Sequence, residues 1–398
     1  MQPFAPQMRQ MIAQYEQRHP NVHVHWVDVP FSEGEKRALT AMLSPNTPDV
    51  INLNPSFSAI LASRNALLDM NQWTTPAQRA LYLPVVWQST TFRHKTVGVP
   101  WYVTSQVTFY NRGLLQRYAA GRVPSNAESL AQLAKTMRHH PDSSAYAVMP
   151  TLTEGGQFLK QLLKQGVPLW EDAYPEEKLM KAQHPVLTAV FARQGAATVL
   201  DYWKTLYQQR LIPADALTEG HRAAVDRYQS GQLALLMAGA NFLNIVKENA
   251  PTVYANTGIA PQFPTQSAYT DFSPMVLVVP KRSKHPKQAV DFALFVTNTY
   301  NQLLLCQQAP VLPSTRQGLK DPMFAPPAPT EVDPAKLARA LSAKQLLAAT
   351  QPPPLHPRQR EIHELVDYYV QAALLGEMSA QVAMAKAEER VSVLLKEE

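Results

Sequence analysis

The chain has 398 residues, of which 45% are hydrophobic and 17% are charged. This length predicts two or three domains with real hydrophobic cores, and the composition excludes a disordered protein. Lysine and arginine (37) exceed aspartate and glutamate (31) by six, which is too small an excess for a nucleic-acid-binding protein of this length. The single cysteine, Cys306, excludes an internal disulfide framework and a cysteine-rich zinc site. No apolar stretch reaches the roughly 20 residues of a membrane-spanning helix.

The first seventy residues alternate between helix and strand patterns. Apolar residues at helical spacing predict a helix around 8–15, and apolar alternation over 22–29 predicts a strand. A helix over 32–43, a strand over 50–53 and a helix over 56–65 follow. This alternation favours an α/β fold with a parallel sheet.

The same alternation continues along the rest of the chain. Two strands, 98–103 and 107–110, are predicted on either side of a polar break at 104–106. A helix beginning near Ser125 and a long helix over 188–209 follow. Further strands are expected at 233–237, 257–260 and 275–279, and further helices at 241–248, 288–298, 334–347, 361–375 and 379–396.

Motifs for nucleotide or metal chemistry are absent or weak. The sequence has no Walker loop, no G-x-G-x-x-G, no G-x-S-x-G and no H-E-x-x-H. His23 with His25 forms a possible metal half-site, and His139 and His140 with Asp142 form another. A solvated strand face and a helix end explain these residues better. We therefore expect neither a metal nor a cofactor.

Aromatic and polar residues gather near predicted strand ends. Trp101 and Tyr102 lie at the mouth of a strand, and Phe242 lies near a predicted turn. Aromatic faces pack on the apolar CH faces of sugar rings, and neighbouring polar groups such as Asn54 and Thr104 bond hydroxyls. In open α/β sheets, ligands bind beyond the carboxyl ends of strands. The alternative for each aromatic residue is a place in the core.

Several short motifs follow one another in a fixed order. They are P-D-V-I-N at 48–52, G-V-P-W-Y at 98–102, F-Y-N-R-G-L-L at 109–115, S-G-Q-L-A-L-L-M-A-G at 230–239 and K-H-P-K-Q-A-V-D-F at 284–292. Their order resembles that of the bacterial extracellular solute-binding proteins of family 1. These are the maltose-binding-protein-like sugar receptors of ABC importers. The resemblance covers most of the chain.

The resemblance implies the type II periplasmic-binding-protein fold: two α/β lobes, each a mainly parallel sheet flanked by helices, with a helical C-terminal tail. Lobe 1 is expected at 1–106 and 262–306, and lobe 2 at 107–261 and 307–398. The implied function is the substrate-binding component of an ABC-type importer. It binds a carbohydrate in the inter-lobe cleft and delivers it to a membrane permease. No catalysis, no cofactor, no nucleic acid and a monomeric state are expected.

The resemblance also indicates where the ligand is bound. Relatives often place an aromatic residue where this chain has Asn241, and Phe242 is the replacement that the chain offers. Asp271 lies in the segment that returns to the first lobe, and Arg358 lies in the tail loop. The expected ligand-binding residues are Asn54, Phe57, Trp101, Tyr102, Thr104, Glu154, Asn241, Phe242, Asp271 and Arg358.

The start of the chain departs from the family pattern. Relatives begin with an export signal and a first strand internal to the sheet, whereas this chain opens at the following helix. A parallel sheet without that strand would leave backbone groups unpaired on both neighbouring strands. We therefore expect the natural start to lie upstream and the mature protein to be periplasmic or otherwise extracytoplasmic.

Two other functions stay open. Glu154, Glu171 and Asp172 are able to supply the paired carboxylates of a glycosidase, although nothing in the sequence brings them together. A carbohydrate-active enzyme using a pair such as Glu154 and Glu171 is therefore an alternative. A partner-binding module with an occluded cleft is another. A sugar panel separates the three by binding, turnover or neither.

Overall fold

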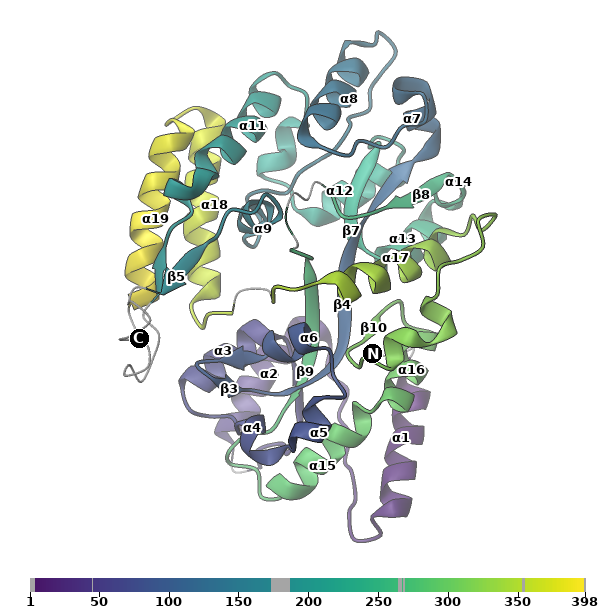
Figure 1. Cartoon of the computed structure of the whole chain (residues 1–398), viewed down its shortest axis with the longest axis vertical. Helices are drawn as coiled ribbons and strands as arrows, with labels where there is room; N and C mark the ends of the chain where they lie inside the picture. The colour runs from purple at the N-terminus through teal and green to yellow at the C-terminus, as the bar shows by residue number, and fades with distance from the viewer. Residues whose placement is uncertain are drawn as a thin grey trace. The chain divides into compact units, whose positions relative to one another are not determined.

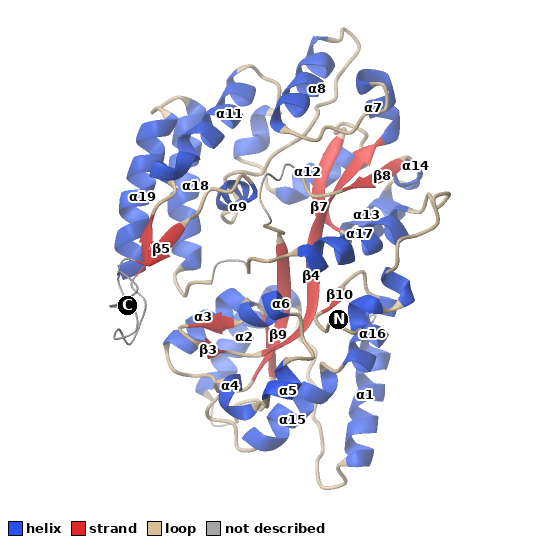
Figure 2. Cartoon of the chain, viewed as in Figure 1, coloured by secondary structure: helices blue, strands red, loops and turns tan. Residues whose placement is uncertain are grey.

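The protein is described here by a computed structural model that covers residues 4–44, 46–172, 187–263, 267, 269–352 and 355–396 (Figure 1). The chain divides into two compact units that both mix helices with strands (Figure 2). Unit 1 comprises Met1–Ser105, Phe272–Pro327 and Ser342–Pro357, and unit 2 comprises Gln106–Asp271, Ala328–Leu341 and Arg358–Glu398. Each unit is therefore assembled from three separate segments.

Unit 1 is built around an antiparallel sheet, whose strands lie in the order β1-β9-β4-β10. The strands are β1 (Ile51–Leu53), β9 (Phe272–Val278), β10 (Leu312–Pro313) and the first half of β4 (Val99–Asn111), with a separate hairpin of β2 (Thr91–Phe92) and β3 (Lys95–Thr96). The helices are α1 (Ala5–Arg18), α2 (Phe31–Leu43), α3 (Pro55–Ser63), α4 (Met70–Trp73), α5 (Pro76–Arg79), α6 (Pro84–Gln88), α15 (Pro286–Val296) and α16 (Thr299–Gln308).

Alternation along β9 divides the apolar side chains of unit 1 between two cores. Val276 and Val278 enter the cluster that contains Phe57 of α3. Leu277, between them in the sequence, enters the cluster that contains Met11 of α1. Since successive side chains of a strand point to opposite faces, helices cover both faces of this sheet. Burial of each such side chain contributes about 1.5–3 kcal/mol to stability.

Unit 2 contains the second half of β4, which pairs antiparallel with β7 (Leu235–Gly239) and β8 (Thr257–Ala260). A second hairpin is formed by β5 (Trp170–Asp172) and β6 (Leu187–Ala189). The helices are α7 (Arg112–Ala119), α8 (Ala127–His139), α9 (Gln157–Lys164), α11 (Ala197–Gln208), α12 (His221–Gln229), α13 (Phe242–Asn249), α14 (Pro251–Ala255), α18 (Gln359–Leu375) and α19 (Ala380–Lys396); α17 (Pro334–Ala348) is divided between the units.

The C-terminal helices α18 and α19 lie side by side and complete the larger core of unit 2 (Figure 1, yellow). Val366 and Val370 of α18 and Val391 of α19 are fully buried. They join the cluster that contains Trp203 of α11 and Leu162 of α9. The tail is therefore part of the core of this unit. None of the helices in the described part of the chain combines the length and apolar character needed to span a bilayer.

Most predicted helices are confirmed, but the predicted strand over 22–29 is wrong. Residues 22–30 form no regular structure, and Val27 is 60% exposed. Val24 N–H donates to the side chain of Glu16 instead of a neighbouring strand. Among the described residues no strand pairs with this segment. Alternation alone does not hold a strand, because the backbone groups of a strand need a partner.

Two further predictions differ from the structure in their boundaries. The two strands expected at 98–103 and 107–110 form the single strand β4, because inward and outward side chains continue to alternate through 104–106. The long helix expected over 188–209 begins later, at Ala197, after the strand β6. Gly195 has a φ of +106°, a conformation outside the helical region, so the helix cannot extend back through it.

Strand pairing also differs from the expectation of mainly parallel sheets. Every ladder between named strands in the described residues is antiparallel. Parallel pairing is found at an isolated bridge between Tyr146 and Leu233. The strand expected at 22–29, which was to join the sheet of the first unit, is missing from it. The remaining strands of that sheet meet β4 or β9 in the antiparallel sense.

The expected lobe boundaries differ from the units at several places. Residue 106 and residues 262–271, expected in lobe 1, belong to unit 2. Residues 307–327 and 342–357, expected in lobe 2, belong to unit 1. The segment 307–327 contains β10, whose pairing with the first half of β4 fixes it in unit 1.

Candidate functional site

A tight loop before α9 carries Glu154. Gly155 and Gly156 have φ values of +58° and +74°, a conformation that strains other residues, so the chain turns sharply here. The Thr153 hydroxyl donates to the Leu217 carbonyl with 3.0 Å between the oxygens. These contacts fix the loop next to the start of α12.

The Glu154 carboxylate caps α12. Its Oε2 accepts a hydrogen bond from the backbone N–H of His221, with 2.6 Å between N and O. A Cβ on Gly220 would lie 2.6 Å from Oε1, so a larger residue at this position would displace the Glu154 carboxylate. A carboxylate at the N-terminus of a helix is stabilised by the exposed N–H groups and the helix dipole. Glu154 is nevertheless an exposed residue, so part of it still faces solvent.

The imidazole of His221 meets the ring of Phe242 edge to face, with 4.8 Å between centroids and 79° between planes. Burial lowers the pKa of His221; the nearby Glu154 carboxylate opposes this shift and Lys160 adds to it. The half-buried ring of Phe242 begins α13. An imidazole with a lowered pKa therefore lies near the Glu154 carboxylate and contacts an aromatic ring.

Lys160 and Lys164 stand one turn apart on α9 and surround Asp271. The Lys160 Nζ lies 3.1 Å from Asp271 Oδ1. Lys164, only 1% exposed, donates to Gln106 Oε1 at 3.3 Å. Burial lowers the pKa of Lys164. Burial alone would raise the pKa of Asp271, but the two lysines outweigh it and hold that pKa below its usual value.

Backbone contacts hold Asp271 in place. Its carbonyl accepts the Gln106 N–H at 3.1 Å, and its own N–H donates to Gln262 Oε1 at 3.0 Å. The second carboxylate oxygen, Oδ2, is buried without a hydrogen-bond partner in the described structure. Asp271 was predicted to touch ligand, and the structure places it beneath Lys160, whose side chain is one-third exposed.

The other predicted residues of unit 2 lie at helix starts. Asn241 is exposed and immediately precedes Phe242 at the start of α13. Arg358 precedes α18 and pairs with Glu361 within that helix, its Nε 3.1 Å from Oε2. The structure thus brings Glu154 and Phe242 together around His221, while Arg358 is engaged in its own helix.

The predicted residues at the start of α3 have structural partners in unit 1. Asn54 caps α3: its Oδ1 accepts the Phe57 N–H at 2.8 Å, and its Nδ2 donates to Glu35 at 2.7 Å. Phe57 is 8% exposed and belongs to a hydrophobic core. Both residues therefore take part in packing and capping in this structure.

The predicted residues on β4 face partly inward. Trp101 is 3% exposed and packs against Phe4 and Tyr102, with 6.0 and 5.2 Å between ring centroids. Burial raises the pKa of the half-buried Tyr102, and a hydrogen bond with Asn52 opposes that shift. The Thr104 hydroxyl donates to a neighbouring strand carbonyl at 3.2 Å. Trp101 is thus a core residue here.

Sequence reasoning missed Lys160, Lys164 and His221. The two lysines lie in the segment F-L-K-Q-L-L-K at 158–164, where spacing of four predicts only a helix face. A lysine on the apolar side of such a helix is the one available signal, because lysines are almost never fully buried without a partner. His221 carries no motif in its neighbourhood.

The other candidate clusters have ordinary surroundings. Glu171 is exposed and pairs with Arg193, while Glu154 caps α12, so the two carboxylates have different partners. His23 and His25 are exposed. No group of three or more metal-ligating side chains is assembled within the part of the chain that the structure describes.

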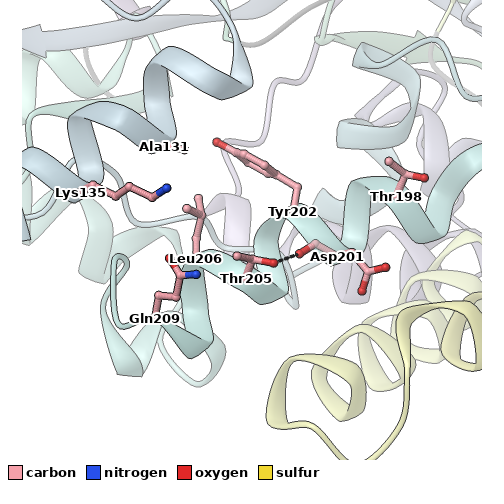
Figure 3. A pocket seen from close by; sticks show the side chains of 8 residues that line it. All are labelled: Ala131, Lys135, Thr198, Asp201, Tyr202, Thr205, Leu206 and Gln209. Carbon is pink, nitrogen blue, oxygen red and sulfur yellow. Dashed lines mark hydrogen bonds between the residues drawn. The ribbon is translucent and has the colours of Figure 1, made fainter.

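A shallow depression of about 290 Å³ lies between α8 and α11 in unit 2 (Figure 3). The Tyr202 hydroxyl beside it donates to the Ala127 carbonyl at 2.8 Å. None of the predicted site residues lines it. Its lining residues are Ala131, Lys135, Thr198, Asp201, Tyr202, Thr205, Leu206 and Gln209.

Two α/β units that share strand β4, with a helical tail built into the second, are the architecture of periplasmic solute-binding proteins. A crystal structure assigned as an oligosaccharide periplasmic-binding protein from Synechococcus sp. MITs9220 has a TM-score of 0.83 and 29% identity, covering 99% of this chain and 97% of that one. The sugar-binding protein MalE from Xanthomonas citri has a TM-score of 0.77 and 22% identity, covering 98% and 94%.

The chain belongs to the bacterial extracellular solute-binding protein family, whose family model matches residues 2–302. A probable ABC transporter-binding protein from Deinococcus radiodurans is 21% identical over 264 residues, which are 64% of this chain and 60% of that relative's length. The predicted family and the periplasmic-binding-protein fold class are confirmed, whereas the expected parallel pairing is not found between the named strands of the described residues. The family is one of binding proteins.

Proposed function

We propose that this protein is the substrate-binding component of an ABC-type importer and that it binds a carbohydrate without transforming it. The observation that carries the proposal is the cluster of Glu154, Lys160, His221 and Phe242 in unit 2, which we propose as the binding surface. Similarity to a protein assigned as oligosaccharide-binding and to a sugar-binding protein supports the carbohydrate class.

The chemistry of the binding surface suits a sugar. Each sugar hydroxyl donates one hydrogen bond and accepts others. A carboxylate accepts the bond that the hydroxyl donates, and an ammonium group donates to the hydroxyl oxygen. The ring of Phe242 offers an apolar face to the CH groups of a pyranose. His221, with its lowered pKa, supplies a neutral imidazole that both donates and accepts.

The enzymatic alternative has less support. A glycosidase needs two carboxyl groups a few ångströms apart on either side of the bond. Glu154 is held by the start of α12, and Glu171 is paired with Arg193. Asp271 is buried and paired with Lys160. Because each of the three carboxylates is held by a different partner, the structure offers less support for a catalytic pair than for binding.

Further parts of the proposal follow from the family. We propose that units 1 and 2 are the two lobes of the binding protein, that the partner is an ABC permease, and that the protein acts as a monomer outside the cytoplasmic membrane. The family's description as extracellular supports the location. The expected ligand residues Asn54, Phe57, Trp101, Tyr102, Thr104, Asn241 and Arg358 stay predictions.

A panel of mono- and oligosaccharides tests the function. We expect one sugar class to raise the melting temperature, because a ligand at 100 times its dissociation constant adds about 2.7 kcal/mol to stability. The recovered sugar should be unchanged by chromatography. Glu154→Ala should abolish the shift, while Glu171→Ala, a surface carboxylate on β5, should keep it. Product that accumulates in proportion to protein would favour the enzyme, and no shift with any sugar would refute the proposal.

A further inference from the structure

The loop that carries Glu154 is fastened to α18 by one carboxylate. Asp367 accepts a hydrogen bond from the Gly156 N–H, with 3.3 Å between N and Oδ2, and the nearby Gly155 N–H also favours its charged form. Both glycines have positive φ. Successive backbone amides of this kind converge on a single anion. A residue of the C-terminal tail therefore holds the backbone that directly follows Glu154.

His363 strengthens the same contact. It precedes Asp367 by one turn on α18, so both side chains lie on one face of the helix. A Cβ on Gly156 would lie 2.4 Å from His363 Cδ2, which shows that the imidazole packs directly on the loop backbone. Burial, with Lys160 nearby, lowers the pKa of His363 to about 4, so the ring is neutral at physiological pH.

Packing alone does not account for a carboxylate at this place. The Asp367 Oδ1 is buried and has no hydrogen-bond partner in the described structure. Burial is the largest cause that raises the pKa of Asp367 to about 6, and Glu154 and Glu364 raise it further, against the two glycine N–H groups. An ionised Asp367 therefore makes the fold less stable at neutral pH than an uncharged residue would. What the carboxylate supplies is the attachment of the loop.

We propose that Asp367 is a positioning residue of the binding surface, which fixes Glu154 through the backbone of Gly155 and Gly156. Glu154 is then fixed from two sides: Asp367 holds the backbone that follows it, and the His221 N–H holds its carboxylate. This role rests on the proposed carbohydrate binding, because the held carboxylate is the group that meets the sugar. Preorganisation of this kind improves affinity by removing the cost of ordering the loop.

The proposal makes binding sensitive to acid. The charged groups that face Asp367 are Glu364 on its own helix and Glu154 in the loop, while Lys160 of α9 faces His363. A proton on Asp367 removes the charge that attracts the glycine amides. The affinity of the wild type should therefore fall by up to about threefold between pH 7 and pH 5, because the protonated carboxyl keeps a carbonyl acceptor but loses its charge.

The first arm of the test needs no ligand. Hydrogen–deuterium exchange is followed in the peptide spanning 152–158 at pH 7. Asp367→Ala should speed exchange at the Gly156 amide about tenfold, because its hydrogen bond to the carboxylate is lost. Glu389→Gln, which removes an exposed acid of the neighbouring helix α19, is the matched control and should leave exchange unchanged. Equal exchange in Asp367→Ala and the wild type would overturn the attachment.

The second arm measures the affinity for the sugar found by screening, at pH 5, 6, 7 and 8. Asp367→Ala should bind about tenfold more weakly at pH 7. Asp367→Asn keeps a carbonyl acceptor but does not titrate, so it should bind within threefold of the wild type at pH 7 with a flat pH profile. Its melting temperature at pH 7 should equal or exceed that of the wild type.

The outcomes separate the two proposals. Unchanged affinity in Asp367→Ala, with sugar bound by the wild type, overturns the positioning role alone. A merely structural Asp367 would lower the melting temperature of Asp367→Asn and leave its pH profile like that of the wild type, which also overturns the role. A wild type that binds no sugar overturns the proposed function and the positioning role with it, whatever the exchange arm gives.

Discussion

The Lys160 ammonium group lies 3.1 Å from the buried Oδ1 of Asp271, while one-third of the lysine side chain faces solvent. A free lysine loses rotamer entropy when it binds a ligand. Asp271 removes much of that freedom before the ligand arrives. The exposed donors of Lys160 are therefore oriented by a residue that itself stays beneath the surface.

The buried charges of this cluster predict that two mutations differ strongly in their effect on stability. Asp271→Asn should lower the free energy of unfolding by about 2–4 kcal/mol, because Lys164 and Lys160 lose their countercharge. Lys164→Met should be within about 1 kcal/mol of the wild type, because an apolar side chain of similar length replaces a buried cation. Urea denaturation at pH 7 measures both. Equal losses in the two variants would contradict this account.

Trp101 should contribute to stability more than to binding. Its ring is 3% exposed and packs against Phe4 and Tyr102. Trp101→Ala should cost about 3–5 kcal/mol of unfolding free energy, since a cavity remains in the core. Trp101→Phe should lose less. Denaturation and calorimetry separate the roles: a stable Trp101→Ala protein with weakened sugar binding would show that the ring reaches the ligand.

The elements that sequence patterns predicted well are those with long, regular periodicity. The tail helices α17, α18 and α19 begin and end within two residues of the expected positions, because their apolar stripes repeat over four turns. The segment 22–29 has an equally regular alternation but no strand beside it. Strand pairing depends on a second segment elsewhere in the fold, so the apolar alternation of one segment alone does not predict it.

Phe242 should serve binding with little effect on the fold. The half-buried ring packs on the His221 imidazole and on a small core. Phe242→Ala should weaken sugar binding by about 1–3 kcal/mol, as for other aromatic contacts. Leu243→Ala, the adjacent buried residue of α13, is the control that should lower stability by about 2–5 kcal/mol. Isothermal titration with matched melting curves checks both, and unchanged affinity in Phe242→Ala would remove the ring from the binding surface.

Two neighbouring glycines should respond differently to alanine. Both have positive φ, which costs alanine about 1 kcal/mol. A Cβ at Gly156 also meets the imidazole of His363 at 2.4 Å, whereas nothing lies within 4 Å of one at Gly155. Gly156→Ala should therefore lose more stability and more affinity than Gly155→Ala. Equal melting temperatures of the two variants would contradict the contact with α18.

His363 and Asp367 should affect acid stability in opposite directions. The pKa of His363 falls from 6.5 to about 4, so the folded protein binds fewer protons in that window and loses stability as the pH falls through it. The pKa of Asp367 rises from 3.8 to about 6, so stability is gained as the pH falls from 6 to 3.8.

Asp367→Asn removes the stability that protonation of Asp367 adds at acid pH, but it keeps the destabilising effect of protonating His363. Its melting temperature should therefore drop more steeply than that of the wild type between pH 6.5 and pH 4. Because both groups are partly exposed, the difference in unfolding free energy should be on the order of 1 kcal/mol. Scanning calorimetry at several pH values measures it. Parallel curves for the two proteins would contradict the assigned pKa directions.

The candidate site was only partly accessible from sequence. Glu154 and Phe242 were predicted from motif order, and the structure brings both to His221. Lys160 and Asp271 are distant in sequence, and no spacing rule links them. The burial of Trp101 was also hidden, because an aromatic residue at a strand end suits a core as well as a ligand.

The division of each unit into three segments has a consequence for synthesis on the ribosome. The core of unit 1 joins Phe4 to Leu346, and that of unit 2 joins Leu115 to Leu395. A nascent chain emerges from its N-terminus, and domains made of one continuous segment can fold as they emerge. Here neither core closes until most of the polypeptide has been made. The partly made protein therefore exposes apolar surface for most of its translation. Both cores form only after synthesis is nearly finished.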